Sequence, residues 1–277
     1  MSAEKLDNLS TRVAQVEHGA ASRSEAVVDL SHRTLGHTRT VSLESDCVVR
    51  GLVCAETLFL PTDERAALVT GHSPQAGAAL EAYKGLRTRL LKLRSSQGFR
   101  SIAVTSLCHG EGKTTTSLNL AHCFAQLENV SVLLIDADLR RRGLTHLLLG
   151  LPCEGIYDVL ADDVPYSSAI ARAEGTSLYA MGTGRRPASG TELFSSGRWA
   201  DLMRWASAQF SITVVDTVSM SVPADLDLTL SQCDRTLLVV RSGNTRREDL
   251  RTATQHLDPN KLAGIVFNGS HGFKPEY

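Results

Sequence analysis

The sequence predicts a doubly wound α/β fold, in which helices cover both faces of a mainly parallel sheet, together with an N-terminal extension. Two observations predict this class. The apolar runs are rich in Val, Leu and Ile, and they alternate with segments of helical character. Strands that are apolar throughout are buried on both faces, as in parallel sheets. The first apolar run begins at Ser101, and the others span residues 131–136, 177–182, 211–216, 235–241 and 262–268.

Composition sets outer limits on the class of protein. The chain has 277 residues, of which 42% are hydrophobic, and a formal net charge of −1. A charge so close to zero gives no argument for bulk nucleic-acid binding or for disorder. The six cysteines are scattered without metal-type spacing, so we expect reduced thiols in a cytoplasmic protein. No signal peptide and no apolar run of about 20 residues is present, so we expect any membrane association to come through a partner.

The first 75 residues differ from the remainder, because they mix charged, Ser, Thr and His residues without a clear hydrophobic period. We assign residues 1–75 to a partly flexible extension and residues 76–277 to the main domain. The start of the extension has two interpretations, a solvated arm or a short partner-binding helix. Residues 77–93 predict an amphipathic helix that leads into the first core strand. Its apolar positions are Leu80, Tyr83, Leu86 and Leu90, while Glu81, Lys84 and Arg87 lie on another face.

A glycine-rich turn follows the strand that begins at Ser101 and precedes a helix-forming stretch. Backbone N–H groups of such a turn can point at a polyphosphate, Lys113 can reach the outer phosphates, and the Thr114 hydroxyl can hold a magnesium ion. The strict pattern has glycine where this chain has Leu107, but Gly110 still supplies a flexible position. The residues predicted to bind phosphate are His109, Gly110, Glu111, Gly112, Lys113, Thr114 and Thr115.

Three aspartates come at the ends of predicted strands. Asp136 and Asp138 follow the run 131–136, and Asp216 closes the run 211–216. Carboxylates two residues apart in extended backbone point the same way, so we expect one of the first pair to serve a metal and the other to take a proton. Asp216 stands where a Walker B aspartate would hold magnesium between the phosphates. Because ligands bind beyond the carboxyl ends of parallel strands, these groups predict one nucleotide and metal site.

The combined motifs resemble a known family over roughly residues 75–268. They are the Gly-Glu-Gly-Lys-Thr loop with Asn119-Leu120-Ala121, the IDADLRR strand end with Gly143, His146 and Leu151, and the VVDT segment. They look like the bacterial protein-tyrosine kinases of capsule and exopolysaccharide systems, in the MinD/ParA-like branch of P-loop ATPases.

The resemblance implies a set of roles and two cofactors, ATP and Mg²⁺. It implies that Lys113, Asp136 and Asp138 are catalytic, with Asp138 activating the incoming tyrosine hydroxyl. It also implies that Asn268 contacts the adenine base. The residues implied to hold the metal are Thr114, Asp136 and Asp216.

The same resemblance implies partners. Family members work with a transmembrane polysaccharide co-polymerase, the chain-length adaptor, and assemble as rings. We therefore expect a cytoplasmic protein, peripheral at the inner membrane through that adaptor, with no nucleic-acid partner. The helix face with Glu81, Lys84 and Arg87 resembles the family's Glu-x-x-Arg-x-x-Arg contact motif, and implies a homo-oligomer. Lys84 keeps the charge of the middle arginine but not its planar fork.

The chain departs from the family pattern at three places. His109 replaces a proline and is either a phosphate contact or a tolerated loop residue. Val218 and Ser219 replace two prolines, and Tyr277 is the only tyrosine beyond Asn268, where relatives have a tyrosine cluster. These departures leave two alternatives to a tyrosine kinase that regulates polysaccharide polymerisation and export. One is a kinase-inactive nucleotide-binding scaffold of an export complex. The other is a MinD/ParA-type positioning ATPase, although those carry a lysine at the position of Cys108.

Overall fold

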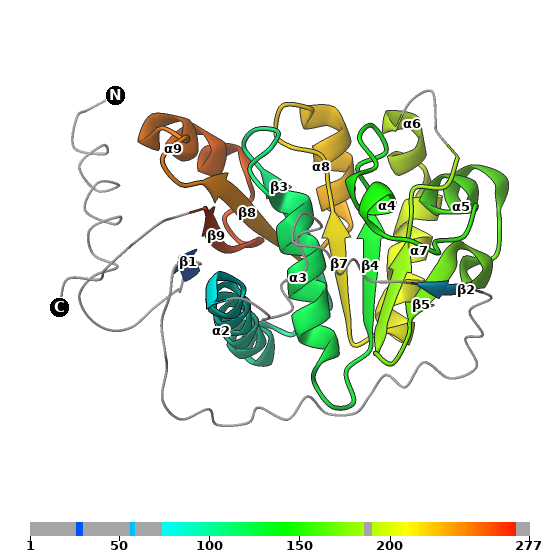
Figure 1. Cartoon of the computed structure of the whole chain (residues 1–277). Helices are drawn as coiled ribbons and strands as arrows, with labels where there is room; N and C mark the ends of the chain where they lie inside the picture. Colours follow the sequence, from blue (N-terminus) through cyan, green and yellow to red (C-terminus); the bar gives the residue numbers. More distant parts are fainter. Residues whose placement is uncertain (1–25, 30–55, 59–73, 186–189, 270–277) are drawn as a thin grey trace.

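The computed structural model describes residues 26–29, 56–58, 74–185 and 190–269. In this part of the chain nine strands form one sheet in the order β1-β9-β8-β3-β7-β4-β6-β5-β2 (Figure 1). Every pairing is parallel except that of β5 with β6. The strands are β1 (Ala26–Asp29), β2 (Glu56–Leu58), β3 (Ser101–Ser106), β4 (Val132–Asp136), β5 (Ile170–Ala173), β6 (Leu178–Met181), β7 (Ile212–Asp216), β8 (Arg235–Arg241) and β9 (Leu262–Asn268).

Helices cover both faces of the sheet, which confirms the predicted fold class. Figure 1 shows α2 and α3 on the near face and α7 on the far face. The described helices are α2 (Pro74–Gln97), α3 (Lys113–Ala125), α4 (Gly143–Leu147), α5 (Ile156–Asp162), the 3₁₀ turn η2 (Tyr166–Ala169), α6 (Thr191–Phe194), α7 (Gly197–Gln209), α8 (Pro223–Ser231) and α9 (Arg247–His256). No helix of the described ranges is long and apolar enough to cross a bilayer.

Two apolar layers explain why the central strands are hydrophobic at every position. Leu134 and Val214 pack on one face with Phe124 of α3, whereas their chain neighbours Ile135 and Val215 pack on the other face with Trp199 of α7. Successive side chains of a strand point to opposite faces, so a strand between two helical layers needs apolar residues at both. Trp199 is fully buried, as expected for a packing residue, and its indole N–H donates to the Thr229 carbonyl at 3.3 Å.

The six predicted core strands are all present, and three further strands, β1, β2 and β5, were not predicted. The strand β5 has only four residues, of which Arg172 is exposed, so it lacks the continuous apolar run of the others. The strands β1 and β2 lie within residues 1–75 and pair with β9 and β5. The remainder of that segment lies outside the described residues, and a domain boundary at residue 75 stays a prediction.

The amphipathic helix predicted over residues 77–93 is present as the longer helix α2. Tyr83, Leu86 and Leu90 are buried against the sheet side, in agreement with the predicted apolar face. On the polar face, Lys84 forms an ion pair with Glu81 at 2.7 Å, and Arg87 donates from Nη1 to the Cys123 carbonyl at 2.7 Å. The ion pair lies within α2, whereas the Arg87 hydrogen bond fastens α2 to α3.

Candidate functional site

The turn between β3 and α3 has the backbone shape that a phosphate-binding loop requires. Gly110 and Gly112 have φ values of 83° and 97°, in the left-handed region that favours glycine. A Cβ atom on Gly112 would lie 1.9 Å from Nδ2 of Asn268, so the Asn268 side chain would have to move and give up its hydrogen bond to the Glu111 carbonyl. The turn therefore needs glycine for conformation at both positions and for space at Gly112. Immediately after it, Lys113 opens α3, whose N-terminus offers free N–H groups and a partial positive charge.

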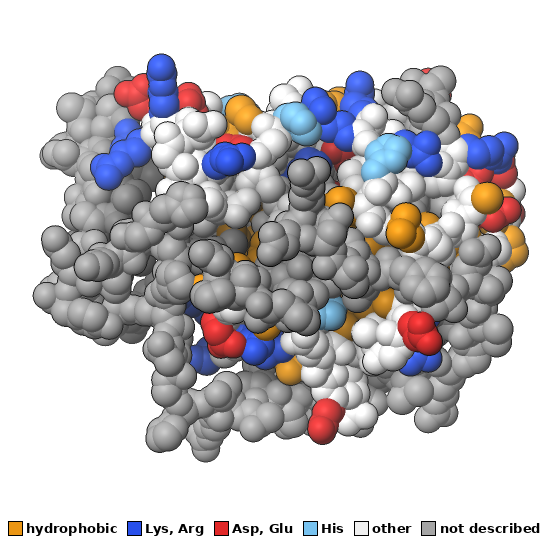
Figure 2. All heavy atoms as spheres, in the orientation of Figure 1, with side chains coloured by type: hydrophobic (Ala, Val, Ile, Leu, Met, Phe, Trp, Pro, Cys, Tyr) orange, Lys and Arg blue, Asp and Glu red, His pale blue; other side chains and the backbone are white. Residues whose placement is uncertain are grey.

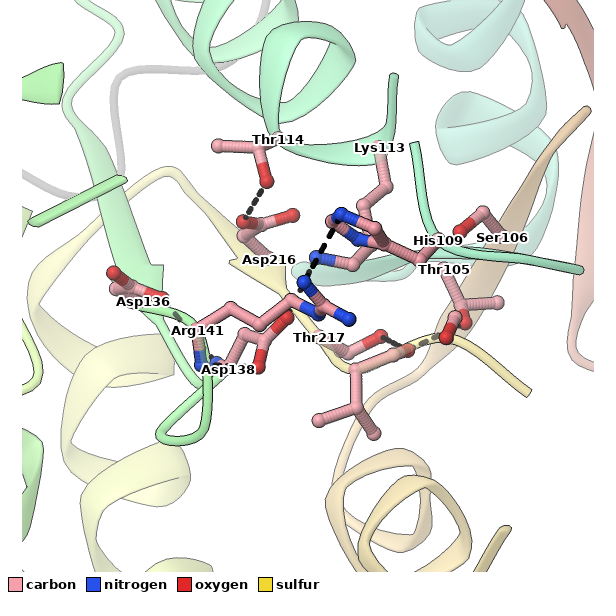
Figure 3. Close-up of polar contacts among 12 residues, drawn as sticks. Thr105, Ser106, His109, Lys113, Thr114, Asp136, Asp138, Arg141, Asp216 and Thr217 are labelled. Carbon is pink, nitrogen blue, oxygen red and sulfur yellow. Dashed lines mark hydrogen bonds and ion pairs between the residues drawn. The ribbon is translucent and has the colours of Figure 1, made fainter. Parts of the chain in front are cut away.

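Lys113 is buried in an ion pair with Asp138. Its Nζ atom lies 2.7 Å from Oδ2, and the two side chains are 8% and 2% exposed. Burial on its own would lower the pKa of Lys113, but the negative charges of Asp216 and Asp138 outweigh it and raise the pKa above its ordinary value. The ammonium group is therefore held in its charged form at the mouth of the loop, beside the end of β4 (Figure 3).

Asp216 joins the end of β7 to the first turns of α3. Its Oδ2 atom accepts a hydrogen bond from the Thr114 hydroxyl at 2.8 Å, and its Oδ1 atom accepts one from the Ser117 hydroxyl at 3.0 Å. Thr114 and Ser117 are three residues apart and so lie on one face of the helix. The carboxylate is fully buried, and Figure 3 shows it between Thr114 and Lys113. The predicted metal ligands Thr114 and Asp216 are thus in direct contact.

Asp136 lies beside Asp216 because β4 and β7 pair in parallel with these two residues in register. Its Oδ2 atom accepts hydrogen bonds from the backbone N–H and the hydroxyl of Thr145, both at 2.8 Å. Burial, followed by the charge of Asp216, raises the pKa of Asp136 to about 7. Burial also raises the pKa of Asp216 to about 6, against the lowering effect of Lys113. Burial and the neighbouring charge of Asp216 disfavour the carboxylate form of Asp136, so a cation bound beside these two groups would be favoured.

Asp136 and Asp138 do not point the same way, contrary to the sequence-based expectation. Asp136 faces Thr145, whereas Asp138 faces Lys113 (Figure 3). The alternation of a strand does not extend to Asp138, because β4 ends at Asp136 and the chain then turns. In that turn the backbone N–H of Arg142 donates to the Asp138 carbonyl at 2.8 Å. The two carboxylates consequently occupy different parts of the site.

The other predicted loop residues have distinct surroundings. The imidazole of His109 is exposed and its Nε2 lies 3.0 Å from Nη1 of Arg141, on the turn after β4. The Glu111 side chain is buried and accepts hydrogen bonds from the Cys108 backbone N–H and the Thr245 hydroxyl. Asn268 donates from Nδ2 to the Glu111 carbonyl at 3.0 Å, so it packs on the loop. Thr115 is half-buried on the first turn of α3.

The loops at the carboxyl ends of the strands make this edge of the molecule basic. Figure 2 shows Lys, Arg and His side chains along the upper edge of the face drawn. The exposed cations on these loops include Arg140 and Arg141 after β4, Arg241 at the end of β8 and Arg246 in the loop that follows it. An anionic ligand would be attracted to this edge although the whole chain has a net charge of only −1.

The oxygen donors of Thr114, Asp136 and Asp216 suit a hard cation such as Mg²⁺. In the described residues no three His, Cys, Asp or Glu side chains gather into a self-contained metal centre. That absence is compatible with Mg²⁺, which usually takes one or two protein ligands and completes its shell with phosphate oxygens and water. The donor set therefore fits magnesium that arrives with a polyphosphate.

Sequence reasoning missed Ser117 and Thr145, which hold the two strand-end carboxylates. Ser117 could have been found, because it lies one helical turn from Thr114 and so shares its face. Thr145 gave no local signal. It reaches Asp136 only because α4 folds back over the end of β4.

Comparison with known proteins places this site in a family context. Residues 102–270 match the family described as CobQ/CobB/MinD/ParA nucleotide binding domain. The chain is 32% identical to the tyrosine-protein kinase YwqD of Bacillus subtilis (strain 168) over 191 residues, which are 68% of this chain and 80% of that protein. It is 29% identical to the tyrosine-protein kinase CpsD of Streptococcus pneumoniae over 211 residues, covering 72% of this chain and 92% of the relative.

A solved structure shows the same fold. The kinase domain of the Escherichia coli tyrosine kinase ETK superposes with a TM-score of 0.66 at 24% identity, over 82% of this chain and 96% of that one.

Gly112→Ala should destabilise the protein and weaken binding of any phosphate ligand at the loop. The added methyl group meets Asn268 and the residue also keeps a left-handed backbone, whereas Gly110→Ala has the same backbone problem with open space around it. We expect Gly110→Ala to cost about 1 kcal/mol of unfolding free energy, and Gly112→Ala clearly more. Urea unfolding of the two variants makes the comparison. Equal losses would show that the contact with Asn268 does not restrict the position.

Asp136→Asn should change how stability depends on pH in metal-free protein. The folded-state pKa of about 7 lies above the ordinary value for aspartate, so the folded state binds the proton more tightly. The resulting contribution to stability is complete at low pH and is lost as the pH rises through about 7. Relative to Asp136→Asn, the wild type should lose up to about 1.4 kcal/mol per pH unit between pH values of about 5 and 7.

Urea unfolding at several pH values in the presence of a chelator measures this slope. Asp201→Asn is the control, because Asp201 is exposed on α7. Parallel profiles for the wild type and Asp136→Asn would contradict the proposed proton uptake at this site.

Proposed function

The chain belongs to the CobQ/CobB/MinD/ParA nucleotide-binding family, in its group of bacterial tyrosine-protein kinases, and from this we propose that it transfers the γ-phosphoryl group of ATP to protein tyrosines. The observation that carries the proposal is the convergence of Lys113 with the carboxylates of Asp136, Asp138 and Asp216 at one edge of the sheet. A loop that cradles phosphates and carboxylates that suit Mg²⁺ are the two parts that phosphoryl transfer needs.

In the proposed reaction the phosphates of ATP lie in the loop between β3 and α3, against its N–H groups. Lys113 neutralises charge on the transferring group, which is the largest single contribution expected of such a site. Thr114, Asp136 and Asp216 would hold Mg²⁺, which neutralises charge on the phosphates when bound. The charged state of Lys113, set by its carboxylate neighbours, keeps this function available at neutral pH.

Asp138 is the proposed base. The tyrosine oxygen forms a bond with the γ-phosphorus, the bond between that phosphorus and the bridging oxygen of ADP breaks, and the hydroxyl proton passes to Asp138. The carboxylate is oriented for this by two contacts, its ion pair with Lys113 and a 3.1 Å hydrogen bond from the Arg141 backbone N–H to Oδ1. Once phosphate oxygens compete for Lys113, the Asp138 carboxylate becomes available to the acceptor.

The acceptor tyrosine comes from outside the described part of this chain. Tyr83 and Tyr179 are buried, and burial raises the pKa of Tyr83 to about 12. Tyr157 and Tyr166 are each half-buried in contact with a neighbouring side chain, the guanidinium of Arg185 and the indole of Trp205. We therefore propose that the kinase acts on other polypeptides or on Tyr277, which lies outside the described residues.

The proposed setting is the regulation of polysaccharide polymerisation and export. We propose that the protein works in the cytoplasm and reaches the inner membrane through a transmembrane co-polymerase. We also propose homo-oligomerisation through the α2 face that carries Glu81, Lys84 and Arg87. In this chain Glu81 is exposed, whereas Arg87 already donates to Cys123, so Glu81 is the better placed of the two for an intermolecular contact. A scaffold without catalysis and a positioning ATPase are not favoured, because the curated relatives are tyrosine-protein kinases.

Lys113→Met should abolish transfer of labelled γ-phosphate from ATP to a synthetic copolymer of glutamate and tyrosine. The loss should reach at least about 100-fold, since a preorganised charge that stabilises the transition state contributes that much. Asp138→Asn should also reduce transfer strongly while nucleotide binding persists, because it removes the proton acceptor and keeps the size of the side chain. Lys92→Met, on the exposed end of α2, is the matched control and should behave as wild type.

Stoichiometric binding of ATP without transfer to any tyrosine, even with the cytoplasmic segment of a cognate adaptor present, would contradict the kinase proposal and favour the scaffold. Wild-type activity in Lys113→Met would contradict the assignment of the site itself.

A further inference from the structure

A buried acid sits inside the loop that is proposed to receive phosphates. The Glu111 side chain is only 6% exposed. No ion pair to Glu111 occurs among the residues that the structure describes. A buried carboxylate is costly unless hydrogen bonds compensate it, and one placed beside bound phosphates also repels them. The residue therefore needs a structural reason to be tolerated here.

Hydrogen bonds to both oxygens of the Glu111 carboxylate offset the free-energy cost of burying it. Its Oε2 atom accepts from the backbone N–H of Cys108, in the same loop, at 2.7 Å. Its Oε1 atom accepts from the Thr245 hydroxyl at 2.7 Å and, more weakly, from the backbone N–H of Arg241 at 3.5 Å. Thr245 belongs to the loop between β8 and α9, 134 residues further along the chain. The carboxylate thus closes the phosphate loop on itself and joins it to a second loop.

The loop between β8 and α9 is anchored to the centre of the sheet. It leaves the end of β8, which pairs directly with β3 in the centre of the sheet. Arg241 also donates from Nη1 to the Gly110 carbonyl at 3.4 Å, so the same segment contacts two consecutive residues of the phosphate loop. On the other side the Glu111 carbonyl accepts from Asn268 at the end of β9. The loop is therefore held through Glu111 by the segments at the ends of β8, which pairs with β3, and of β9, the next strand on that side.

We propose that Glu111 and Thr245 form a latch that holds the phosphate loop in its binding shape. Glu111 is a positioning residue in this proposal, since its carboxylate points to Cys108 and Thr245 and its contacts are with the polypeptide. The inference rests on the proposed function only in requiring that the loop binds a nucleotide.

The latch and simple electrostatics predict opposite effects for one substitution. Glu111→Gln removes a negative charge close to the phosphates, so electrostatics alone predicts tighter nucleotide binding. The amide keeps one acceptor oxygen for Cys108, and its N–H₂ group can only donate, to the Thr245 hydroxyl oxygen. The charge-assisted hydrogen bond from Thr245 becomes a neutral one and the Arg241 N–H loses its acceptor, so the latch predicts weaker binding. The sign of the change decides between the two.

Thr245→Val removes the hydroxyl that bonds to Glu111 and leaves the negative charge of Glu111 in place, so it tests the latch without an electrostatic change. Binding of the fluorescent nucleotide N-methylanthraniloyl-ADP to the full chain with Mg²⁺ should weaken about tenfold, the effect of one lost hydrogen bond to a charged acceptor. Thr245→Ser keeps the hydroxyl and should restore binding. Thr252→Val is the matched control, because Thr252 is exposed on α9 and its hydroxyl donates within that helix, to the Glu248 carbonyl.

Steady-state kinetics supply a second readout. Since the latch shapes the loop and does not touch the reacting atoms, Thr245→Val should raise KM for ATP and leave kcat at saturating ATP close to the wild-type value. Glu111→Gln combined with Thr245→Val should weaken binding by less than the two single losses together, because both substitutions act on the same contact.

Tighter binding by Glu111→Gln, or equal binding by Thr245→Val and Thr252→Val, would overturn the latch. These outcomes are separate from a failure of the proposed function, in which the wild type itself would not bind the nucleotide. Thermal melting of each variant distinguishes a weakened site from a protein that has not folded. If Glu111→Gln does not fold, the comparison of Thr245→Val with Thr245→Ser still tests the latch.

Discussion

The arrangement of the site depends on a concentration of buried charge at the carboxyl edge of the sheet. Asp136, Asp138 and Asp216 are almost completely buried within reach of the single ammonium group of Lys113. Burial disfavours every one of these charges, and the three carboxylates also repel one another. The attraction of the carboxylates to Lys113 and the hydroxyl and N–H donors around them offset that cost. The excess of negative charge makes the site complementary to a cation, and the glycine-rich loop beside it makes the site complementary to phosphates.

The topology of the sheet creates this concentration. Because β3 lies between β7 and β8, and β7 lies between β3 and β4, the loop after β3 and the aspartates that end β4 and β7 must meet at one edge. The parallel register then sets Asp136 opposite Asp216. The same topology brings β8 and β9 to the other side of the loop, where Glu111 and Asn268 fasten it. One set of strand pairings thus positions both the charged groups and the loop.

Much of this was predictable from local sequence, and the remainder was not, for physical reasons. The loop glycines, Lys113 and the strand-end aspartates follow from residue type and from their position after an apolar run. The separate directions of Asp136 and Asp138 depend on where β4 ends, which apolar periodicity does not define to one residue. The contacts of Thr145 and Thr245 join distant segments, and hydroxyl residues are too common in loops to mark such contacts in one sequence. The short strands β1, β2 and β5 lack the apolar run that identified the others.

A crystal structure with Mg²⁺ and a non-hydrolysable ATP analogue would test the central claim most directly. The account predicts that Nζ of Lys113 contacts oxygens of the outer phosphates, and that the magnesium ion lies about 2.1 Å from the Thr114 hydroxyl oxygen, with Asp216 and Asp136 beside it directly or through water. An analogue bound elsewhere, or bound in the loop while the metal lies away from Thr114 and the strand-end aspartates, would contradict it.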